Sequence, residues 1–313
     1  MKPLLFALCV VLVFGGLSAQ ETVWRPLPGH KQMPIWPGAV PDPQPVAGPE
    51  VAKTTGKEFL VAGRPAVGVS NVTQPTITVY SPQGKNTGAA VVGNGISSCE
   101  IARALGLTQK TAWFMDHRIR LSMQDDFAGT KMGSGSGEIE ADESFIGGKA
   151  RNMHVSERKR RITWTGTKDK TAVMGILERG GKVRATVVPN RRKGTLQAEV
   201  RKHVEAGTAL YTDALLSYEG LAGEYAHQVV DHAVQYVDGR VHTNGLENFW
   251  SLLKRGISGT YVSVEPFHLY RYLDEQAFRF NNRKLTDADR FNMALMGVVG
   301  KRITYQELIG KAS

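Results

Sequence analysis

The chain has few cysteines and few acidic residues, and none of its apolar runs reaches the length of a membrane span. Its 313 residues include two cysteines, Cys9 and Cys99, too few for a disulfide framework or a cysteine-rich zinc site. Any metal ion must therefore be held by oxygen or histidine ligands. The 39 lysines and arginines outnumber the 29 acids, and the net charge of +10 suits an anionic partner such as nucleic acid or a membrane surface.

Proline is nearly absent from the larger part of the chain. Twelve of the 14 prolines lie between Pro3 and Pro82, which leaves Pro189 and Pro266 for the remaining 231 residues. The overall composition, 42% apolar and 22% charged, is that of a soluble protein with a core, and it excludes fibrous, collagen-like and wholly disordered chains. The uneven proline content indicates two parts that resemble different proteins.

The first 19 residues have the pattern of a secretory signal peptide. Lys2 precedes an unbroken apolar run, 4–14, and small residues follow it up to Ala19. A membrane span would need about 18 to 20 apolar residues. An apolar helix packed in a core is the alternative. We favour the signal, and with it export, because small residues of the cleavage type follow the run directly.

Residues 20–92 are rich in proline and glycine and contain two strand patterns, 76–80 and 89–92. This layout resembles the opening strands of secreted α/β-hydrolases of the carbohydrate acetyl-esterase type. The resemblance ends at Val92, because no Gly-rich oxyanion loop follows and no G-x-S-x-G nucleophile motif occurs downstream. The nearest sequence, 133–137, has glycine at the serine position. We therefore expect a truncated, poorly ordered β-rich fragment without esterase activity.

Residues 95–124 predict two helices joined by a tight turn, at the spacing of a helix-turn-helix. Gly106 suits the turn, and the Thr108 side chain can cap the second helix. That helix carries four basic or histidine side chains: Lys110, His117, Arg118 and Arg120. We take Lys110 and Arg118 as candidate DNA contacts, with simple helix packing as the alternative.

Residues 138–285 predict an α/β domain, after a glycine-rich linker at 125–137. The patterns follow in the order strand, strand, strand, helix, strand, helix, strand, helix. Strands are expected at 139–145, 172–177, 183–188, 209–213 and 227–234, and helices at 196–206, after 213 and at 243–255. This is the order of a ribonuclease H-like fold, a mixed sheet flanked by helices. Residues 286–313 are expected to form a C-terminal tail.

Three carboxylates occur at points that this fold brings together. Asp142 lies in the first strand, Asp213 at the end of the fourth, and Glu247 on the last helix. Oxygen ligands of this kind bind Mg²⁺ or Mn²⁺, and two such ions can activate an attacking oxygen and stabilise a leaving oxygen at a phosphodiester. A single acid at a strand end is usually only solvated, but three in the right elements favour a metal site.

Basic residues surround these carboxylates in the sequence. The loop 149–170 holds eight lysines or arginines against two acids, and Trp164 offers a ring for base stacking. The candidate nucleic-acid contacts are Arg158, Lys159, Arg160, Arg161, Arg191, Arg192, Lys254 and Arg255. A run of like charge is otherwise a solvated surface. Its place beside the carboxylates favours DNA binding.

Three sequence blocks carry a specific resemblance. They lie within about residues 96–282 and comprise 140–149 (EADESFIGGK), 211–213 (YTD) and 242–256 (HTNGLENFWSLLKRG). The blocks are similar to those of DDE transposases of the ISXO-like group of bacterial insertion sequences. The resemblance implies a metal-binding catalytic triad of Asp142, Asp213 and Glu247, with Asn244 beside the last. It also implies a site role for His232, for which a structural role is the equal alternative.

The resemblance implies partners and a setting as well. DDE transposases use Mg²⁺ or Mn²⁺ and generally act as homo-oligomers on DNA. We therefore expect transposon ends and target DNA as partners, no membrane partner beyond the signal, and action in the cytoplasm at the nucleoid. Members usually begin with a cysteine-rich zinc ribbon, which this chain lacks. The expected function is strand cleavage and strand transfer at an insertion sequence.

A chimera reconciles the two parts of the chain. An insertion-sequence reading frame would have joined the beginning of an exported esterase gene in frame near Gly93. Two alternatives stay open: a ribonuclease H-like nuclease without a joining step, and an exported, inactive fusion whose transposase part never meets DNA. A strand-transfer assay separates the transposase from the nuclease, and the mature N-terminus separates both from the exported fusion.

Overall fold

A computed structural model describes most of the chain from residue 95 onward and short stretches before it. The described residues are 25, 28–30, 32–36, 38–40, 48–54, 60–61, 64–65, 67–78, 95–125, 127, 129–134, 137–147, 154–156, 159, 170–230 and 241–311. The chain divides into two compact units, one of residues 1–34 and 38–80 and one of residues 35–37 and 81–313. The predicted signal peptide lies outside the described residues.

The N-terminal unit contains short antiparallel strand pairs. The pairs are β1 (Gln32–Pro34) with β6 (Thr76–Thr78), β2 (Val51–Thr54) with β5 (Val67–Ser70), and β3 (Leu60–Val61) with β4 (Arg64–Pro65). Ribbons of two strands are only marginally stable by themselves. Strand β6 begins the first expected hydrolase strand, and the second, at 89–92, lies outside the described residues. The likeness to a hydrolase stays a prediction.

Two helices joined by a tight turn open the described part of the larger unit. Helices α1 (Ser98–Leu105) and α2 (Gln109–Ser122) lie within the predicted range, 95–124, and Gly106 between them takes a left-handed φ of 67°. The side chain of Thr108 accepts a hydrogen bond from the N–H of Thr111 and so caps α2, as predicted. DNA recognition by this pair stays a prediction.

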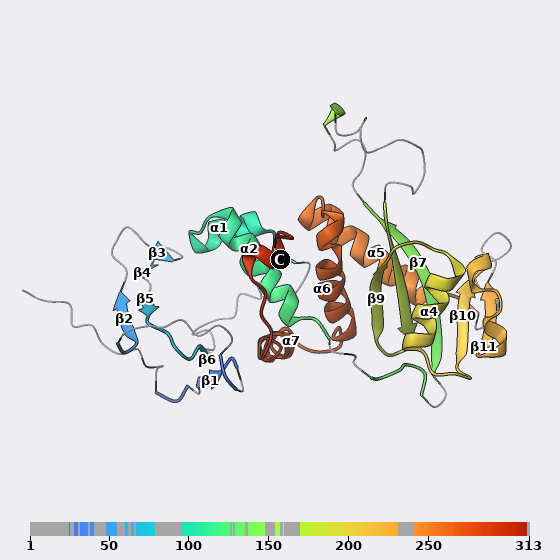
Figure 1. Ribbon diagram of the computed structural model, residues 1–313, viewed down its shortest axis with the longest axis horizontal. Coiled ribbons are helices and arrows are strands. Elements are labelled where there is room, and N and C mark those ends of the chain that lie inside the picture. The colour runs from blue at the N-terminus through green and yellow to red at the C-terminus, as the bar shows by residue number, and fades with distance from the viewer. Residues whose placement is uncertain are drawn as a thin grey trace, which may run out of the picture. The chain divides into compact units, whose positions relative to one another are not determined.

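The larger unit contains a mixed five-stranded sheet, consistent with a ribonuclease H-like fold (Figure 1). Its strands are β7 (Glu138–Ile146), β8 (Thr171–Glu178), β9 (Val183–Val188), β10 (Ala209–Asp213) and β11 (Ala226–Val230). The order is β11-β10-β7-β8-β9. Strand β8 runs antiparallel to β7 and β9, whereas β10 runs parallel to β7 and β11.

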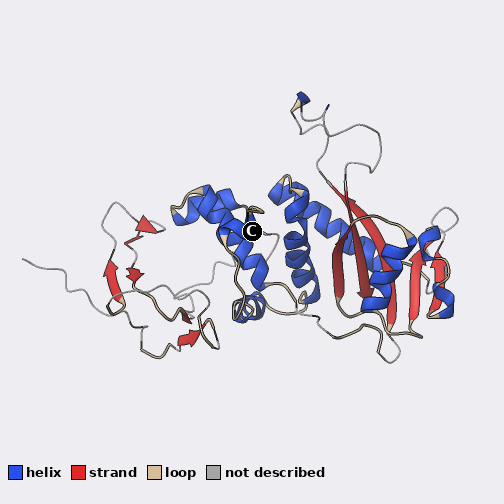
Figure 2. Cartoon of the chain, in the orientation of Figure 1, coloured by secondary structure: helices blue, strands red, loops and turns tan. Residues whose placement is uncertain are grey.

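Helices cover both faces of this sheet (Figure 2). Because successive strand side chains point to opposite faces, β8 contributes Met174 and Ile176 to one core cluster and Val173 and Leu177 to the other. The first cluster includes α4 (Lys193–His203), and the second includes α5 (Asn244–Gly256) and α6 (Leu269–Asn281). Each face therefore buries its own apolar layer.

The prediction of a helix between β10 and β11 is wrong. Two single 3₁₀ turns, Leu216–Tyr218 and Leu221–Gly223, take its place. Gly220 between them has a φ of 93°, a left-handed conformation that interrupts a right-handed helix. The expected 227–234 strand is observed up to Val230, and the residues after it lie outside the described part.

Segments expected to be linker or tail have structure of their own. Met132 in the expected linker is buried beside β8 and α4, and its backbone bridges to Val204. The expected tail forms α7 (Asp287–Met296) and α8 (Tyr305–Leu308), each begun by a threonine capping box. Among the helices in the described part of the chain, none is long and apolar enough to cross a membrane.

Candidate functional site

The strand register places two of the predicted acids beside each other. Thr212 of β10 lies opposite Ala141 of β7, so the next residues of these parallel strands, Asp213 and Asp142, neighbour one another. Ala141 belongs to the core cluster under α4. Because side chains alternate along a strand, Asp142 and Asp213 face the opposite side, which α5 covers.

A glycine on β8, Gly175, lets α5 approach this pair. A Cβ at Gly175 would lie 2.7 Å from the side chains of Leu246 and Trp250, so any larger residue would push α5 away. With α5 close, Trp250 Nε1 donates a hydrogen bond to Asp142 Oδ2 at 2.9 Å. The backbone N–H of Glu143 donates to the other carboxylate oxygen at 2.8 Å. Both oxygens of Asp142 are therefore oriented.

A buried glutamate anchors the first turn of α5. The Glu140 side chain is 1% exposed, and its Oε2 accepts a hydrogen bond from the backbone N–H of Leu246 at 3.0 Å. A Cβ at Gly245 would lie 2.8 Å from the same oxygen, so glycine is required for this close approach. Negative charge at a helix N-terminus is also favourable. The anchored turn contains Glu247, the third predicted acid.

Arg179 ties β7 to the segment that leads into α5. Its Nε donates to Glu140 Oε1 at 2.9 Å, and its Nη2 donates to the carbonyl oxygen of His242 at 2.7 Å. The guanidinium lies 4.3 Å from the ring centroid of Tyr211 on β10. One side chain therefore joins two strands and the start of the helix, and with Glu140 it positions the first turn of α5.

The three acids interact electrostatically. Burial, and then the neighbouring carboxylates of Asp213 and Glu247, raise the pKa of Asp142 to about 6 against the hydrogen bond from Trp250. An all-oxygen set of this kind fits Mg²⁺ or Mn²⁺ by its chemistry. As the side chains stand, however, no group of three or more His, Cys, Asp or Glu in the described part of the chain could hold a metal ion.

Sequence reasoning also missed a half-buried acid next to this site. Glu143 follows Asp142 on β7 and therefore faces the opposite side of the sheet, where the Tyr218 hydroxyl donates a hydrogen bond to it. Burial raises the pKa of Glu143 to about 7, and burial together with Glu143 raises the pKa of Tyr218. Strand alternation was the signal that could have found it, because an acid on a core face requires a donor.

The other predicted site residues fall into three groups. Asn244, Glu247, Lys254 and Arg255 are exposed on α5. Lys159, Arg191 and Arg192 are exposed elsewhere, and the Arg191 guanidinium lies 4.6 Å from the ring centroid of Phe145. His232, Arg158, Arg160 and Arg161 lie outside the described residues.

Helix α2 presents fewer positive charges than its sequence suggests. Lys110 and Arg118 are exposed, near the rings of Tyr305 and Phe114 respectively. His117 and Arg120 are 0% and 1% exposed, so they cannot contact DNA in this fold. Their burial follows from the packing of α2 against α6.

Comparison with known proteins shows what this chain is similar to. The ISXO2-like transposase domain matches residues 135–281, which span β7 to α6 and contain the three acids with the residues that orient Asp142 and the first turn of α5. An uncharacterized transposase-like protein of Haemophilus influenzae is 32% identical over 105 residues, covering 33% of this chain and 85% of that protein. No solved structure matches the chain significantly. The chain belongs to the family of proteins with an ISXO2-like transposase domain.

Proposed function

We propose that the chain is an insertion-sequence transposase that cleaves DNA strands and transfers them, with Asp142, Asp213 and Glu247 as the catalytic carboxylates. One observation supports the proposal: Asp142 and Asp213 neighbour one another on the face of the sheet that α5 covers, and the anchored first turn of α5 carries Glu247. Asp142 is influenced by the charges of both others. Mutually repelling carboxylates are costly to assemble, which is typical of functional sites.

Mg²⁺ or Mn²⁺ is the proposed cofactor of this triad. When bound, a divalent ion activates the attacking oxygen and stabilises the leaving oxygen in phosphodiester chemistry. The residues of this chain supply orientation: Trp250 and the Glu143 backbone N–H hold Asp142, while Glu140 holds the turn that carries Glu247. We propose that Asn244 and His232 assist the triad.

DNA is the proposed partner, bound by exposed basic residues around the triad. Lys254 follows Glu247 by two helical turns, about 10 Å along α5, on nearly the same side of the helix. It can therefore contact a phosphate near the one that reacts. The other proposed contacts are Lys110, Arg118, Arg158, Lys159, Arg160, Arg161, Arg191, Arg192 and Arg255. We propose a homo-oligomer on DNA.

We further propose that residues 1–92 are the remnant of an exported hydrolase, joined near Gly93 to a transposase that acts at the nucleoid. The crowding of prolines before Pro82 and the missing nucleophile motif support this origin. Transposition in cells should then be equal or higher without residues 1–92. A sharp fall, with the shortened protein still folded, would contradict the proposal.

Strand cleavage and transfer test the proposed function directly. The full chain is incubated with labelled duplexes copied from the DNA on either side of its gene, with a plasmid as target, in Mg²⁺, Mn²⁺ or EDTA. Asp142→Asn, Asp213→Asn and Glu247→Gln should each lower activity by at least about 1,000-fold, because stabilisation of several kcal/mol is lost. Exposed Glu205→Gln is the control and should keep activity. Full activity in a triad variant would remove that residue, and cleavage without joining would favour a nuclease.

A further inference from the structure

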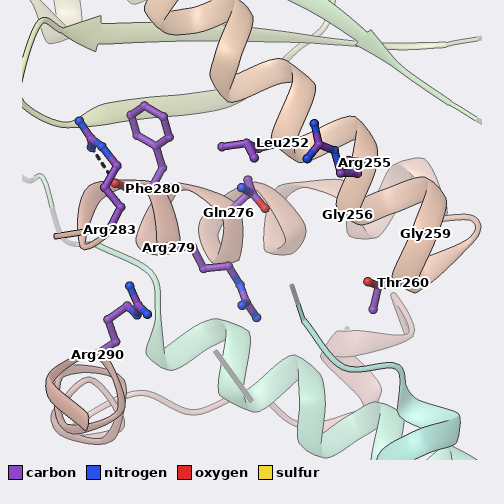
Figure 3. Close-up of a pocket in the computed structure, with 10 residues that line it drawn as sticks. All are labelled: Leu252, Arg255, Gly256, Gly259, Thr260, Gln276, Arg279, Phe280, Arg283 and Arg290. Carbon is purple, nitrogen blue, oxygen red and sulfur yellow. Dashed lines mark hydrogen bonds between the residues drawn. The ribbon is translucent and has the colours of Figure 1, made fainter. Parts of the chain in front are cut away.

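A pocket with four arginines in its walls lies at the C-terminal end of α5, the opposite end from Glu247 (Figure 3). It has a volume of about 370 Å³. Arg255 comes from the last turn of α5, Arg279 from α6, Arg283 from the turn after α6, and Arg290 from α7. Among the described residues that line the pocket, none carries a negative charge.

Only part of this positive charge is balanced. Arg279 pairs with Glu275 and Arg290 with Asp287. In the described part of the chain, Arg255 and Arg283 have no carboxylate partner. The Arg283 guanidinium donates to the carbonyl oxygen of Phe280 at 2.7 Å and lies 4.3 Å from the centroid of its ring. Nε of Arg290 is buried without a hydrogen-bond partner among the described residues. The pocket therefore offers positive charge and free donors to an anion.

The backbone that forms one wall of the pocket is unusual. Helix α5 continues into a π-helical turn, Ile257–Tyr261, whose Gly259 and Thr260 line the pocket. Val262 follows with a φ of 63° and a ψ of −51°, and this positive φ is strained for a β-branched residue. Single π-helical turns and strained residues concentrate at functional sites. This wall has the local features expected of a binding site.

We propose that the arginine pocket binds a backbone phosphate of the DNA on which the triad acts; this rests on the proposed function above. Guanidinium groups match phosphate oxygens in two-point hydrogen bonds. Arg255 lies eight residues after Glu247, about 12 Å along α5, which corresponds to three or four nucleotides at about 3.4 Å each. Apolar Leu252 and Phe280 in the lining suit the sugar beside that phosphate.

The salt dependence of DNA binding tests the pocket. A 40-base-pair duplex is titrated with the full chain and with the double variant Arg255→Gln/Arg283→Gln, since both side chains are exposed and their replacement should leave the fold intact. The slope of log affinity against log salt should fall by about 0.9 for each phosphate that the variant no longer neutralises. Affinity at low salt should fall by about tenfold or more. Arg255→Lys/Arg283→Lys should keep the slope but lose part of the affinity, because lysine lacks the two-point geometry.

A matched control separates the pocket from general charge. Lys284→Gln/Lys311→Gln removes the same charge from exposed residues outside the pocket lining and should change affinity by less than about twofold. Equal losses of affinity in the two double variants would overturn the proposal that the pocket binds a phosphate, and so would an unchanged salt slope in the pocket variant. Neither result would contradict DNA binding by the chain as a whole. A wild-type chain that binds no duplex even at low salt would overturn the proposed function as well.

A second measurement needs no variant. The wild-type chain is treated with an arginine-specific dicarbonyl reagent, with and without the duplex, and the modified sites are mapped by mass spectrometry. Arg255 and Arg283 should be protected by the duplex and not by an acidic peptide of equal charge. Protection by the peptide alone would assign the pocket to a protein partner and overturn the proposal.

Discussion

Helices α2 and α5 both carry basic residues, but the fold buries His117 and Arg120 of α2, whereas it leaves the two basic residues in the last turn of α5 exposed. Arg120 of α2 is 1% exposed, whereas Lys254 and Arg255 of α5 are exposed in its last turn. Both helices belong to the larger unit, and both pack against α6. Buried acidic partners therefore separate Arg120 from the basic residues at the end of α5.

The partners of Arg120 explain the difference. Its Nη2 donates to Asp116 at 2.7 Å and its Nε to Glu275 of α6 at 2.8 Å, and its guanidinium lies 4.0 Å from the ring centroid of Tyr272. Burial disfavours ionised Glu275, but Arg120 and Arg279 outweigh it and hold the pKa of Glu275 below its usual value. Lys254 has no such partner in the described part of the chain, and a cation in the last turn is favoured by the helix dipole.

The largest expected effect comes from breaking the buried network of α2. Arg120→Met should lower the free energy of unfolding by about 3–5 kcal/mol, because buried Asp116 loses its cation and buried Glu275 loses one of its two. Urea unfolding followed by circular dichroism measures the loss. Arg118→Met, an exposed change on the same helix, is the control and should stay within about 0.5 kcal/mol. Equal losses would mean that Arg120 contributes no more than a surface residue.

The second-largest loss of stability should come from replacing Glu140, which anchors the first turn of α5. Glu140→Gln keeps an acceptor for the Leu246 N–H but removes the charge that Arg179 contacts, so unfolding should become easier by about 2–3 kcal/mol. Glu138→Gln is the matched control, since it pairs with the same arginine at 3.4 Å and is 19% exposed. It should cost clearly less, and the reverse order would show that Arg179 does not act through Glu140.

The sequence predicted those features that depend on neighbours along the chain. The five strands of the sheet, the Gly106 turn and the Thr108 cap follow from local patterns. The burial of α2 does not, because Glu275 lies 155 residues away from Arg120. The arginine pocket was missed for the same reason, since its side chains come from separate helices and only folding brings them together.

The face of the sheet that α5 covers shows the same division between local and long-range signals. Asp142, Asp213 and Glu247 were predicted from a strand, a strand end and a helix. The close approach of α5 to Asp142 depends on Gly175, which resembles any other strand glycine in the sequence. The helical signals of α7 and α8 were local and readable. Both helices begin with a capping box, formed by Thr286 with Asp289 in α7 and by Thr304 with Glu307 in α8.

The third-largest effect should be the pH dependence of stability that comes from His117, the other buried basic side chain of α2. Burial and the nearby Arg120 lower the pKa of His117 to about 3. The unfolded chain takes up this proton near pH 6.5 and the folded chain does not, so stability should be full above that pH and fall as the pH drops toward 3. By pH 5 the loss from His117 should reach about 2 kcal/mol.

His117→Phe isolates this contribution, because it keeps a ring against Trp113 but cannot bind a proton. Urea unfolding is measured between pH 7.5 and pH 4.5, and the free energy of unfolding should fall less steeply with falling pH in the variant. At pH 7.5, where His117 is neutral in both states, the difference between the two proteins reports the change in packing alone. Parallel pH profiles would show that His117 is protonated in the folded chain, and α2 would then be more open to solvent than its burial indicates.

The smallest effect on stability should come from replacing Lys254 on α5, and this variant gives the most direct comparison with Arg120 on α2. Lys254→Gln should change the free energy of unfolding by less than about 0.5 kcal/mol, because the side chain is exposed and has no carboxylate partner in the described part of the chain. If Lys254 contacts a phosphate, the slope of log affinity against log salt for duplex DNA should fall by about 0.9. Arg120→Met should do the opposite, with a large loss of stability and, while the protein remains folded, an unchanged slope. A stability loss at Lys254 comparable to that at Arg120 would mean that exposure does not separate the two helices, and an unchanged slope would make the end of α5 a solvated surface.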